Sequence, residues 1–208
     1  LGDYFKAEQL PWFFEFLTDV IGLDPQRIYV SVFLGDEKYN LPKDIESAAI
    51  WKRLFAGKSI AAEEVELGTE VNAAEVGMKD GRIFYYGVKK NLWSRFSGFE
   101  EIPQDEPFGP DSEMFYEFTQ VEHDPKYGKY CHPNCDCGRF LEIGNYVFME
   151  FKKLADNKFE PLPNKNVDFG GGLERITAAF LNESDIFTID LFDSLIQVIE
   201  QFSSKKYS

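Results

Sequence analysis

Histidine and cysteine are scarce in this chain, whose 208 residues include two His and three Cys. Nucleophilic catalysis usually needs a nucleophile activated by a nearby base, and no nucleophile–histidine–acid pattern stands out. An odd number of closely spaced cysteines is unlike a disulfide framework and favours a reducing compartment. We therefore expect a cytoplasmic protein that does not use a catalytic triad.

Long apolar runs and an excess of basic residues are also lacking. No segment approaches the ~18 apolar residues of a membrane span, and Leu1–Lys6 shows no secretory signal pattern. The 36 acidic residues outnumber the 22 basic ones, which gives a net charge of −14. Surfaces that bind a phosphate backbone are usually basic. We expect no membrane association and, for this chain alone, little binding of nucleic acid; the acid excess favours solubility.

Apolar residues make up 44% of the chain, and 21 residues are Phe. This content suits one domain with a sizeable core. Hydrophobic patterning and capping residues predict an α+β domain built on an antiparallel sheet that is flanked by helices. Helices are expected from the Asp3 cap to Gly22, with Pro11 as a start or kink, from Asp44 to Leu54, after the glycines at 170–172 and over 185–202. Strands are expected over 27–33, 82–88, 112–118, 140–151 and 159–162.

Two stretches lack a clear period. Residues 61–81 are polar and acidic, so we expect an insertion loop there, and residues 97–107 predict a second loop. Asp156–Lys158 predicts a turn between two strands. Repeats and interdomain linkers are not apparent, so we interpret residues 1–208 as one domain with an insertion-rich region around 61–137.

Three adjacent glycines, Gly170 to Gly172, follow an apolar residue and precede an acid–arginine pair and a helical pattern. Such a loop lets a ligand approach the backbone, and the N-terminus of the following helix attracts anions. The guanidinium of Arg175, one turn into that helix, is suited to phosphate. The spacing differs from dinucleotide and Walker motifs. The residues alone leave two interpretations open, a phosphate site and a plain strand-to-helix turn.

The cysteines lie together at Cys131, Cys135 and Cys137, close to the only two histidines, His123 and His132. Zinc in structural sites takes four sulfur or nitrogen ligands. We predict a Zn²⁺ site formed by the three cysteines and a histidine, preferring His132 as the nearer in sequence. The spacing is not a common zinc spacing, so a surface loop of free thiols remains the alternative.

The segment Val167–Arg175 resembles motif 3 of the class II aminoacyl-tRNA synthetases, in the form found in alanyl-tRNA synthetases. Further segments resemble the same family in the same order along the chain. They are Leu1–Lys6, Val30–Glu37, Asn91–Trp93, Phe108–Met114 and Glu142–Met149. These six segments are distributed over nearly the whole chain, so the resemblance extends from residue 1 to residue 175. The resemblance implies the class II catalytic fold, incomplete here and running from just after motif 2 through motif 3.

The resemblance implies specific roles for residues near motif 3. Arg175 matches the arginine that contacts the γ-phosphate of ATP, and Asp168 matches the aspartate that binds the amino group of alanine. Gly170 and Gly172 match glycines that leave room for the amino acid and the nucleotide.

Residues outside motif 3 are implied in the same pocket. Trp93 matches a tryptophan that walls the amino-acid pocket, and Asn145 matches an asparagine near it. Glu142 matches an acid that contacts ATP or Mg²⁺, and Glu113 is expected to line the same cleft.

The departures from the family pattern include a lost glycine in 106–110, a longer and more acidic segment over 94–105, and two single positions. Gly144 replaces a Trp, which predicts different packing beneath that strand, and Phe169 replaces a Thr, which removes a hydroxyl from the loop. Motif 1 and most of motif 2, with its arginine for the ATP α-phosphate, are expected to precede residue 1.

The resemblance therefore implies part of an alanine–tRNA ligase, with alanine, ATP, Mg²⁺ and tRNA(Ala) as ligands of the full-length enzyme. This enzyme forms alanyl-adenylate and then transfers the alanyl group to the tRNA. On this interpretation the chain alone is inactive. The departures motivate an alternative, a non-catalytic synthetase-like paralogue that acts as a binding or regulatory module. The cysteines alone motivate a third, a small zinc-binding interaction domain.

Overall fold

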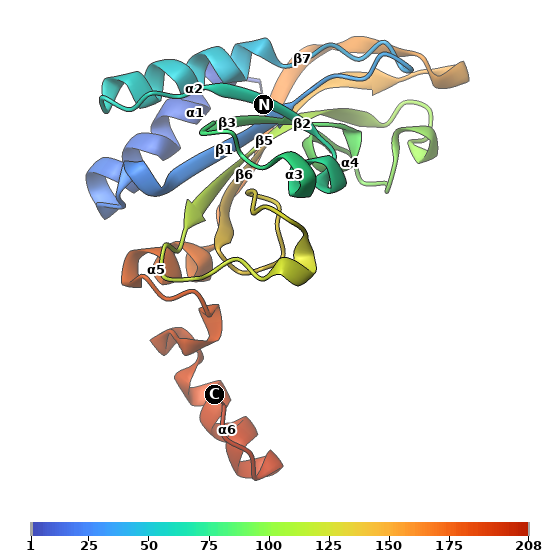
Figure 1. Cartoon of the computed structure of the whole chain (residues 1–208). Helices are drawn as coiled ribbons and strands as arrows, with labels where there is room; N and C mark the ends of the chain where they lie inside the picture. The colour runs from blue at the N-terminus through green and yellow to red at the C-terminus, as the bar shows by residue number, and fades with distance from the viewer. Residues whose placement is uncertain (1, 208) are drawn as a thin grey trace.

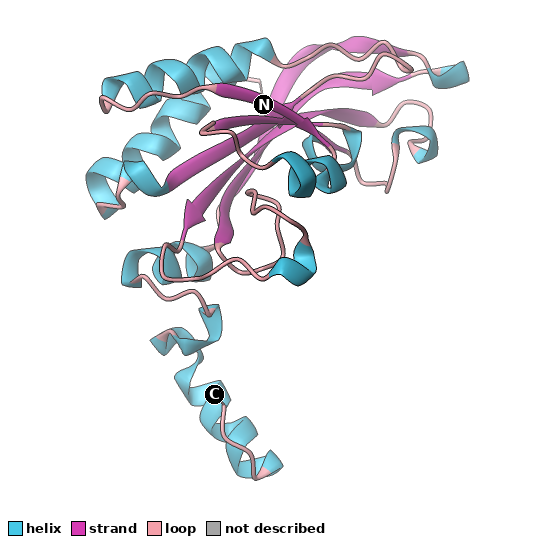
Figure 2. Cartoon of the chain, in the orientation of Figure 1, coloured by secondary structure: helices cyan, strands magenta, loops and turns pink. Residues whose placement is uncertain are grey.

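The computed structural model describes residues 2–207 and places one mixed sheet at the centre of the domain (Figures 1 and 2). The strand order is β2-β3-β1-β5-β6-β7, and β4 pairs with β5 beside this path. The strands are β1 Ile28–Phe33, β2 Glu64–Gly68, β3 Ile83–Tyr86, β4 Leu92–Trp93, β5 Pro107–Glu117, β6 Phe140–Lys153 and β7 Phe159–Gly170. The α-helices are α1 Lys6–Glu15, α2 Ile45–Gly57, α3 Glu70–Val76, α4 Val88–Asn91, α5 Leu173–Leu181 and α6 Asp193–Ser203.

Strand direction changes across the sheet. Strands β1, β5, β6 and β7 form antiparallel pairs, whereas β1 with β3 and β2 with β3 are parallel. Parallel neighbours need a crossover connection, and α3 lies in the connection between β2 and β3. The predicted α+β class is confirmed, and the antiparallel arrangement describes the half of the sheet that includes motif 3.

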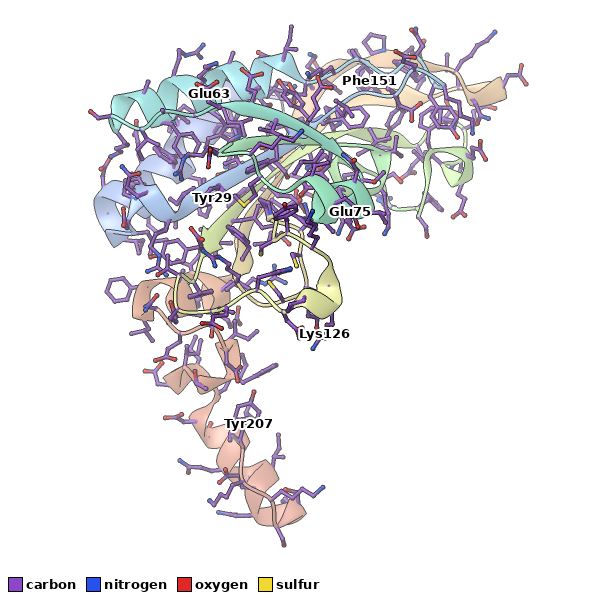
Figure 3. All side chains as sticks on the ribbon, viewed as in Figure 1. Tyr29, Glu63, Glu75, Lys126, Phe151 and Tyr207 are labelled. Atoms are coloured by element: carbon purple, nitrogen blue, oxygen red, sulfur yellow. The ribbon has the colours of Figure 1, made fainter. Side chains whose placement is uncertain are left out.

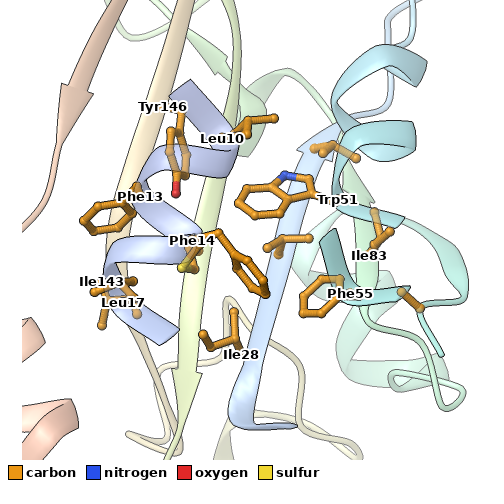
Figure 4. Close-up of a cluster of buried hydrophobic side chains, with 14 of the residues drawn as sticks. Leu10, Phe13, Phe14, Leu17, Ile28, Trp51, Phe55, Ile83, Ile143 and Tyr146 are labelled. Carbon is orange, nitrogen blue, oxygen red and sulfur yellow. The ribbon is translucent and has the colours of Figure 1, made fainter. Parts of the chain in front are cut away.

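Helices α1 and α2 cover one face of the sheet and form the main core with it (Figure 4). The ring of Phe14 on α1 lies 6.0 Å from that of Trp51 and 5.5 Å from that of Phe55, both on α2. Trp51 also lies 5.7 Å from Tyr146 on β6, and its indole nitrogen donates a hydrogen bond to Ser112 Oγ at 2.9 Å. Each such aromatic pair adds about 0.5–1.5 kcal/mol to the effect of burial.

The two predicted helix caps have different outcomes. Asp44 accepts a hydrogen bond from Ser47 N at 3.0 Å and caps α2, as predicted, although the helix continues to Gly57. Asp3 does not cap α1, because the helix begins at Lys6 and the Glu8 carboxylate accepts from Phe5 N.

The first helix passes through its proline. Pro11 lies inside α1, and a π-helix over Phe16–Ile21 extends the helical segment to Gly22. Gly22 has a φ of +85°, a conformation that favours glycine at a helix end. The predicted end is therefore confirmed, and Pro11 does not start the helix.

The prediction of a loop over 61–81 was wrong. This stretch contains the edge strand β2 and helix α3, whose cap is Thr69, which accepts from Asn72 N at 3.1 Å. Its apolar residues are too few to show a period, yet Leu67 and Ala73 pack on Phe84 and Tyr86 of β3. Pairing with β3 and this small cluster determine the structure more than local pattern does.

Residues 97–107 form a loop, as predicted, around a short 3₁₀-helix over Phe99–Glu101. Phe99 and Ile102 in this loop are buried against Phe108.

The end of the chain differs from the single helix predicted over 185–202. Two 3₁₀ turns, Ile186–Thr188 and Asp190–Phe192, precede α6. Figure 1 shows α6 projecting away from the sheet.

Candidate active site

The face of the sheet opposite α1 and α2 carries a grid of polar residues. Alternation along each strand places successive side chains on opposite faces. In one row of paired residues, Ser31 on β1 faces Glu113 on β5, Glu113 faces Asn145 on β6, and Asn145 faces Gly170 on β7.

In the next row, Asp111 on β5 pairs with Val147, which pairs with Asp168 on β7. The two rows therefore bring motif 3 next to the Phe108–Met114 and Glu142–Met149 segments.

The glycine-rich turn lies at the end of this grid. Strand β7 ends at Gly170, and α5 begins at Leu173 with Gly172 as its N-cap. Glycine has no side chain, so no capping side chain accepts hydrogen bonds from the first N–H groups of α5. Those groups and the helix dipole attract an anion. The site predicted from the glycines therefore has the geometry of an anion site as well as that of a strand-to-helix turn.

Arg175 and Glu142 lie together at this turn. Arg175 Nη1 donates to the Glu142 carbonyl at 3.0 Å and to its carboxylate at 3.1 Å. Both side chains are partly exposed, so an entering anion can replace the carboxylate as a partner of the guanidinium. They share a shallow cavity of about 340 Å³ with Asn145, Gly170 and Gly172.

A second cavity of about 300 Å³ adjoins the first through Asn145. Trp93, Glu113, Asp111 and Lys90 line it. Asp168 does not line it; its side chain is exposed on β7, in the row of Asp111. Asp111 was not among the site residues predicted from the sequence. The only local signal was the Asp-x-Glu alternation that places Asp111 and Glu113 on one strand face.

The two cavity carboxylates are hydrogen-bonded and buried. Ser31 Oγ donates to Glu113 at 3.1 Å, and Asn91 Nδ2 donates to Asp111 at 3.0 Å. Burial raises the pKa of Glu113 to about 7, and the charge of Glu142 acts in the same direction. Burial also raises the pKa of Asp111 well above its usual value, with a further contribution from Glu113. The same burial would be offset by a cation that entered the cavity, since an opposite charge favours the ionised form of a carboxyl group.

The three cysteines and one histidine form a cluster apart from the two cavities. It lies in the loop that includes Lys126, below α3 in Figure 3. The ligating atoms of His123, Cys131, Cys135 and Cys137 all lie within 4.8 Å of one another. Cys131 Sγ is 3.4 Å from Cys137 Sγ, and Cys135 Sγ is 3.8 Å from His123 Nδ1. Zn–S bonds of ~2.3 Å in a tetrahedron hold sulfurs roughly 3.8 Å apart, so this cluster fits Zn²⁺.

The choice of His132 as the zinc ligand was wrong in this structure. His132 is buried, and its Nδ1 lies 3.0 Å from Tyr86 Oη on β3, so it fastens the loop to the sheet. His123 takes the place by the sulfurs, and its Nε2 lies 2.9 Å from the carbonyl oxygen of Gly128. Such a bond holds the ring of a metal ligand in position. His132 is closer to the cysteines in sequence, but the fold of the loop places the ring of His123 beside their sulfur atoms.

Comparison with known proteins identifies the family. The model of the family described as tRNA synthetases class II (A) matches residues 1–208. The chain belongs to this family. It is 35% identical over 209 residues to the alanine–tRNA ligases of Treponema denticola and Treponema pallidum, and 32% identical over 207 residues to that of Petrotoga mobilis.

These matches cover 99–100% of this chain but 29%, 29% and 19% of the three relatives. The chain thus spans less than a third of the length of these class II synthetases. Among residues 2–207, no helix combines the length and apolar content needed to cross a membrane.

The two single-residue departures from the synthetase pattern, Gly144 and Phe169, lie next to each other. A Cβ atom at Gly144 would lie 2.7 Å from the ring of Phe13 and 3.4 Å from that of Phe169. The rings of Phe13 and Phe169 are 4.5 Å apart, and Phe169 pairs with Tyr146 on the core face. Phe169 therefore lies in β7 with its ring on the core side. Both departures therefore lie on the core face, in contact with α1, and not on the polar face.

Proposed function

We propose that this chain is part of an alanine–tRNA ligase and contributes to the site where alanine and ATP form alanyl-adenylate. The observation that carries the proposal is the Arg175 guanidinium at the N-terminus of α5, next to a glycine turn and a half-exposed carboxylate. The match over the whole chain to class II synthetases supports it.

Arg175 binds the polyphosphate of ATP in this proposal. Its present partner, the Glu142 carboxylate, is then free to face the Mg²⁺ that accompanies the nucleotide, since carboxylates are ligands that Mg²⁺ takes together with substrate phosphates. Bound Mg²⁺ neutralises phosphate charge. Gly170 and Gly172 allow the nucleotide to approach the backbone.

Alanine lies over β6 and β7 in this proposal. Asp168 pairs with its ammonium group, Asn145 contacts it from β6, and Trp93 limits the size of the side chain that fits. The alanine carboxylate attacks the α-phosphate and pyrophosphate leaves. A 3′-terminal ribose hydroxyl of tRNA(Ala) then attacks the carbonyl carbon of alanyl-adenylate, and AMP leaves. The residues orient the reactants and offset charge, and both effects accelerate such transfers without a protein nucleophile.

The test is alanine-dependent exchange of pyrophosphate into ATP by the full-length protein. Arg175→Ala should reduce the exchange, because losing a charge partner costs ~2–5 kcal/mol. At about 1.4 kcal/mol per tenfold, this loss corresponds to a reduction of roughly 30- to several-thousand-fold. Arg53→Ala, which removes an exposed arginine of α2, is the matched control. Asp168→Ala should mainly weaken alanine binding.

The outcomes separate the two readings of the chain. A folded wild type that exchanges nothing favours the paralogue that acts as a binding module. Normal exchange by Arg175→Ala would show that the arginine is not at the polyphosphate.

We also propose that His123, Cys131, Cys135 and Cys137 hold one structural Zn²⁺. Metal analysis of the purified protein should give about one zinc per chain, and Cys137→Ser should lower it. His132→Ala is the control that keeps the zinc, because the ring nitrogen of His132 lies within hydrogen-bond distance of the Tyr86 hydroxyl and not beside the cysteines. Zinc loss in His132→Ala with retention in His123→Ala would reverse the assignment.

A further inference from the structure

Two buried acids line the cavity beside Trp93. Asp111 and Glu113 are 4% and 9% exposed. Asn91 is 0% exposed, and its amide nitrogen donates hydrogen bonds to Ser31 Oγ at 2.9 Å and to Asp111 at 3.0 Å. Its carbonyl oxygen has no hydrogen-bond partner in the described part of the chain, and neither has that of Asn145.

Neither acid forms an ion pair with another of residues 2–207, although the charge of Lys90 acts on Glu113 from a distance. No Lys, Arg or His nitrogen there lies within 4.0 Å of Asp111 or Glu113. Lys90 lines the same cavity but pairs with Glu70 at 2.9 Å. Buried carboxylates and unpaired amide oxygens are costly without partners. A ligand that offsets this cost carries positive charge and several N–H donors.

We propose that Asp111 is a substrate-binding residue that accepts a hydrogen bond from the ammonium group of the amino acid, together with the free carbonyl oxygen of Asn145. The inference rests on the proposed function and adds a residue to its amino-acid pocket. A primary ammonium has three N–H donors. Asp111, Asn145 and Asp168 offer one acceptor each.

The register of the sheet supports this placement. Asp111 and Asp168 are both paired with Val147, on either side of it. Neighbouring strands lie ~4.8 Å apart, so the two carboxylates flank a position above Val147. An ammonium at that position lies between two acids, with the apolar Val147 beneath the methyl group of alanine. A substrate that lacks the amino group leaves buried acceptors unpaired, which is the strongest basis for rejecting an analogue.

The experiment compares Asp111→Asn with wild type in the full-length protein, by alanine-dependent pyrophosphate exchange. Asparagine keeps the size of the side chain but removes the charge. Hydrogen bonds to charged groups contribute ~1.5–3 kcal/mol, so the KM for alanine should rise about 10- to 100-fold. The kcat and the KM for ATP should change less than about threefold. Glu117→Gln, a buried acid of the same strand that pairs with Arg139, is the control and should leave the KM for alanine unchanged.

A second measurement uses thermal unfolding with L-alanine, L-lactate or MgCl₂ added alone. Alanine should raise the Tm of wild type, lactate should not, and the rise should disappear in Asp111→Asn. Asp111→Glu keeps the charge and should retain part of the alanine effect. It is the variant to use if Asp111→Asn unfolds.

The outcomes distinguish the inference from the proposed function. Normal exchange with an unchanged KM for alanine in Asp111→Asn would overturn the inference and leave the function standing. If wild type exchanges nothing, an alanine-dependent Tm rise that requires Asp111 still supports the inference, and its absence overturns it. A rise with MgCl₂ alone that requires Asp111 would identify a cation site and also overturn it.

Discussion

Replacing Lys6 by Met tests how a buried charge network joins the beginning of the chain to the sheet. Lys6 is 3% exposed, and its Nζ lies 2.9 Å from Asp44 at the cap of α2 and 3.3 Å from Glu150 on β6. A lysine in the first turn of a helix is unfavourable to the helix dipole. The two carboxylates therefore account for its position.

The expected loss follows from what the two acids retain. Removing one partner of a buried ion pair costs ~3–5 kcal/mol. Asp44 keeps its hydrogen bonds from Ser47, and Glu150 keeps Lys165 at 2.7 Å. We expect the lower end of the range, ~3 kcal/mol, which for a chain of this size is a fall in Tm of about 6–12 °C.

Urea and thermal unfolding of the purified chain, followed by circular dichroism, measure this change. Lys165→Met is the matched control, because Lys165 contacts the same Glu150 from a half-exposed position. Exposed pairs contribute ~0–1 kcal/mol. An equal effect of the two substitutions would refute the reasoning.

The pH dependence gives an independent check. Burial lowers the pKa of Lys6, but Asp44 and Glu150 raise it more, so the net shift is upward. Its stabilising effect is complete below the unfolded pKa near 10.5 and is lost as the pH rises through the folded value. The Lys6→Met variant should not show this loss of stability at alkaline pH.

Three further predictions concern packing, titration and metal. Gly144→Trp should destabilise the chain by ~1–3 kcal/mol through overpacking against Phe13, and adding Phe169→Thr should recover part of the loss in urea unfolding. Because the pKa of Glu113 is raised from 4.5 to about 7, stability should fall as the pH rises across that interval; Glu113→Gln should flatten the fall in a series of melts. Removing Zn²⁺ with a chelator should lower the Tm of wild type, but have little effect on Cys137→Ser.

Elements whose signals are local can be predicted from the sequence alone. The glycines at 170–172 and the helical pattern after them predict the turn and α5, and Asp44 predicts the start of α2. Val167–Arg175 also indicates the family, because its residues are contiguous. A capping residue or a tight turn acts within a few residues, so these features can be read without knowing what packs on them.

Features that depend on residues far apart in the chain are visible in the folded domain and not in the sequence. Residues 61–81 form a strand and a helix because they pair with β3 and pack against it, although their own hydrophobic pattern is weak. Strand register aligns Asp111 with Asp168 across 57 positions, and the loop after β5 brings His123 rather than His132 to the cysteines. Alternation shows which face a side chain is on, but not which residue of another strand lies beside it. Register and loop closure are set by packing over the whole domain, and they decide which acids and ligands meet.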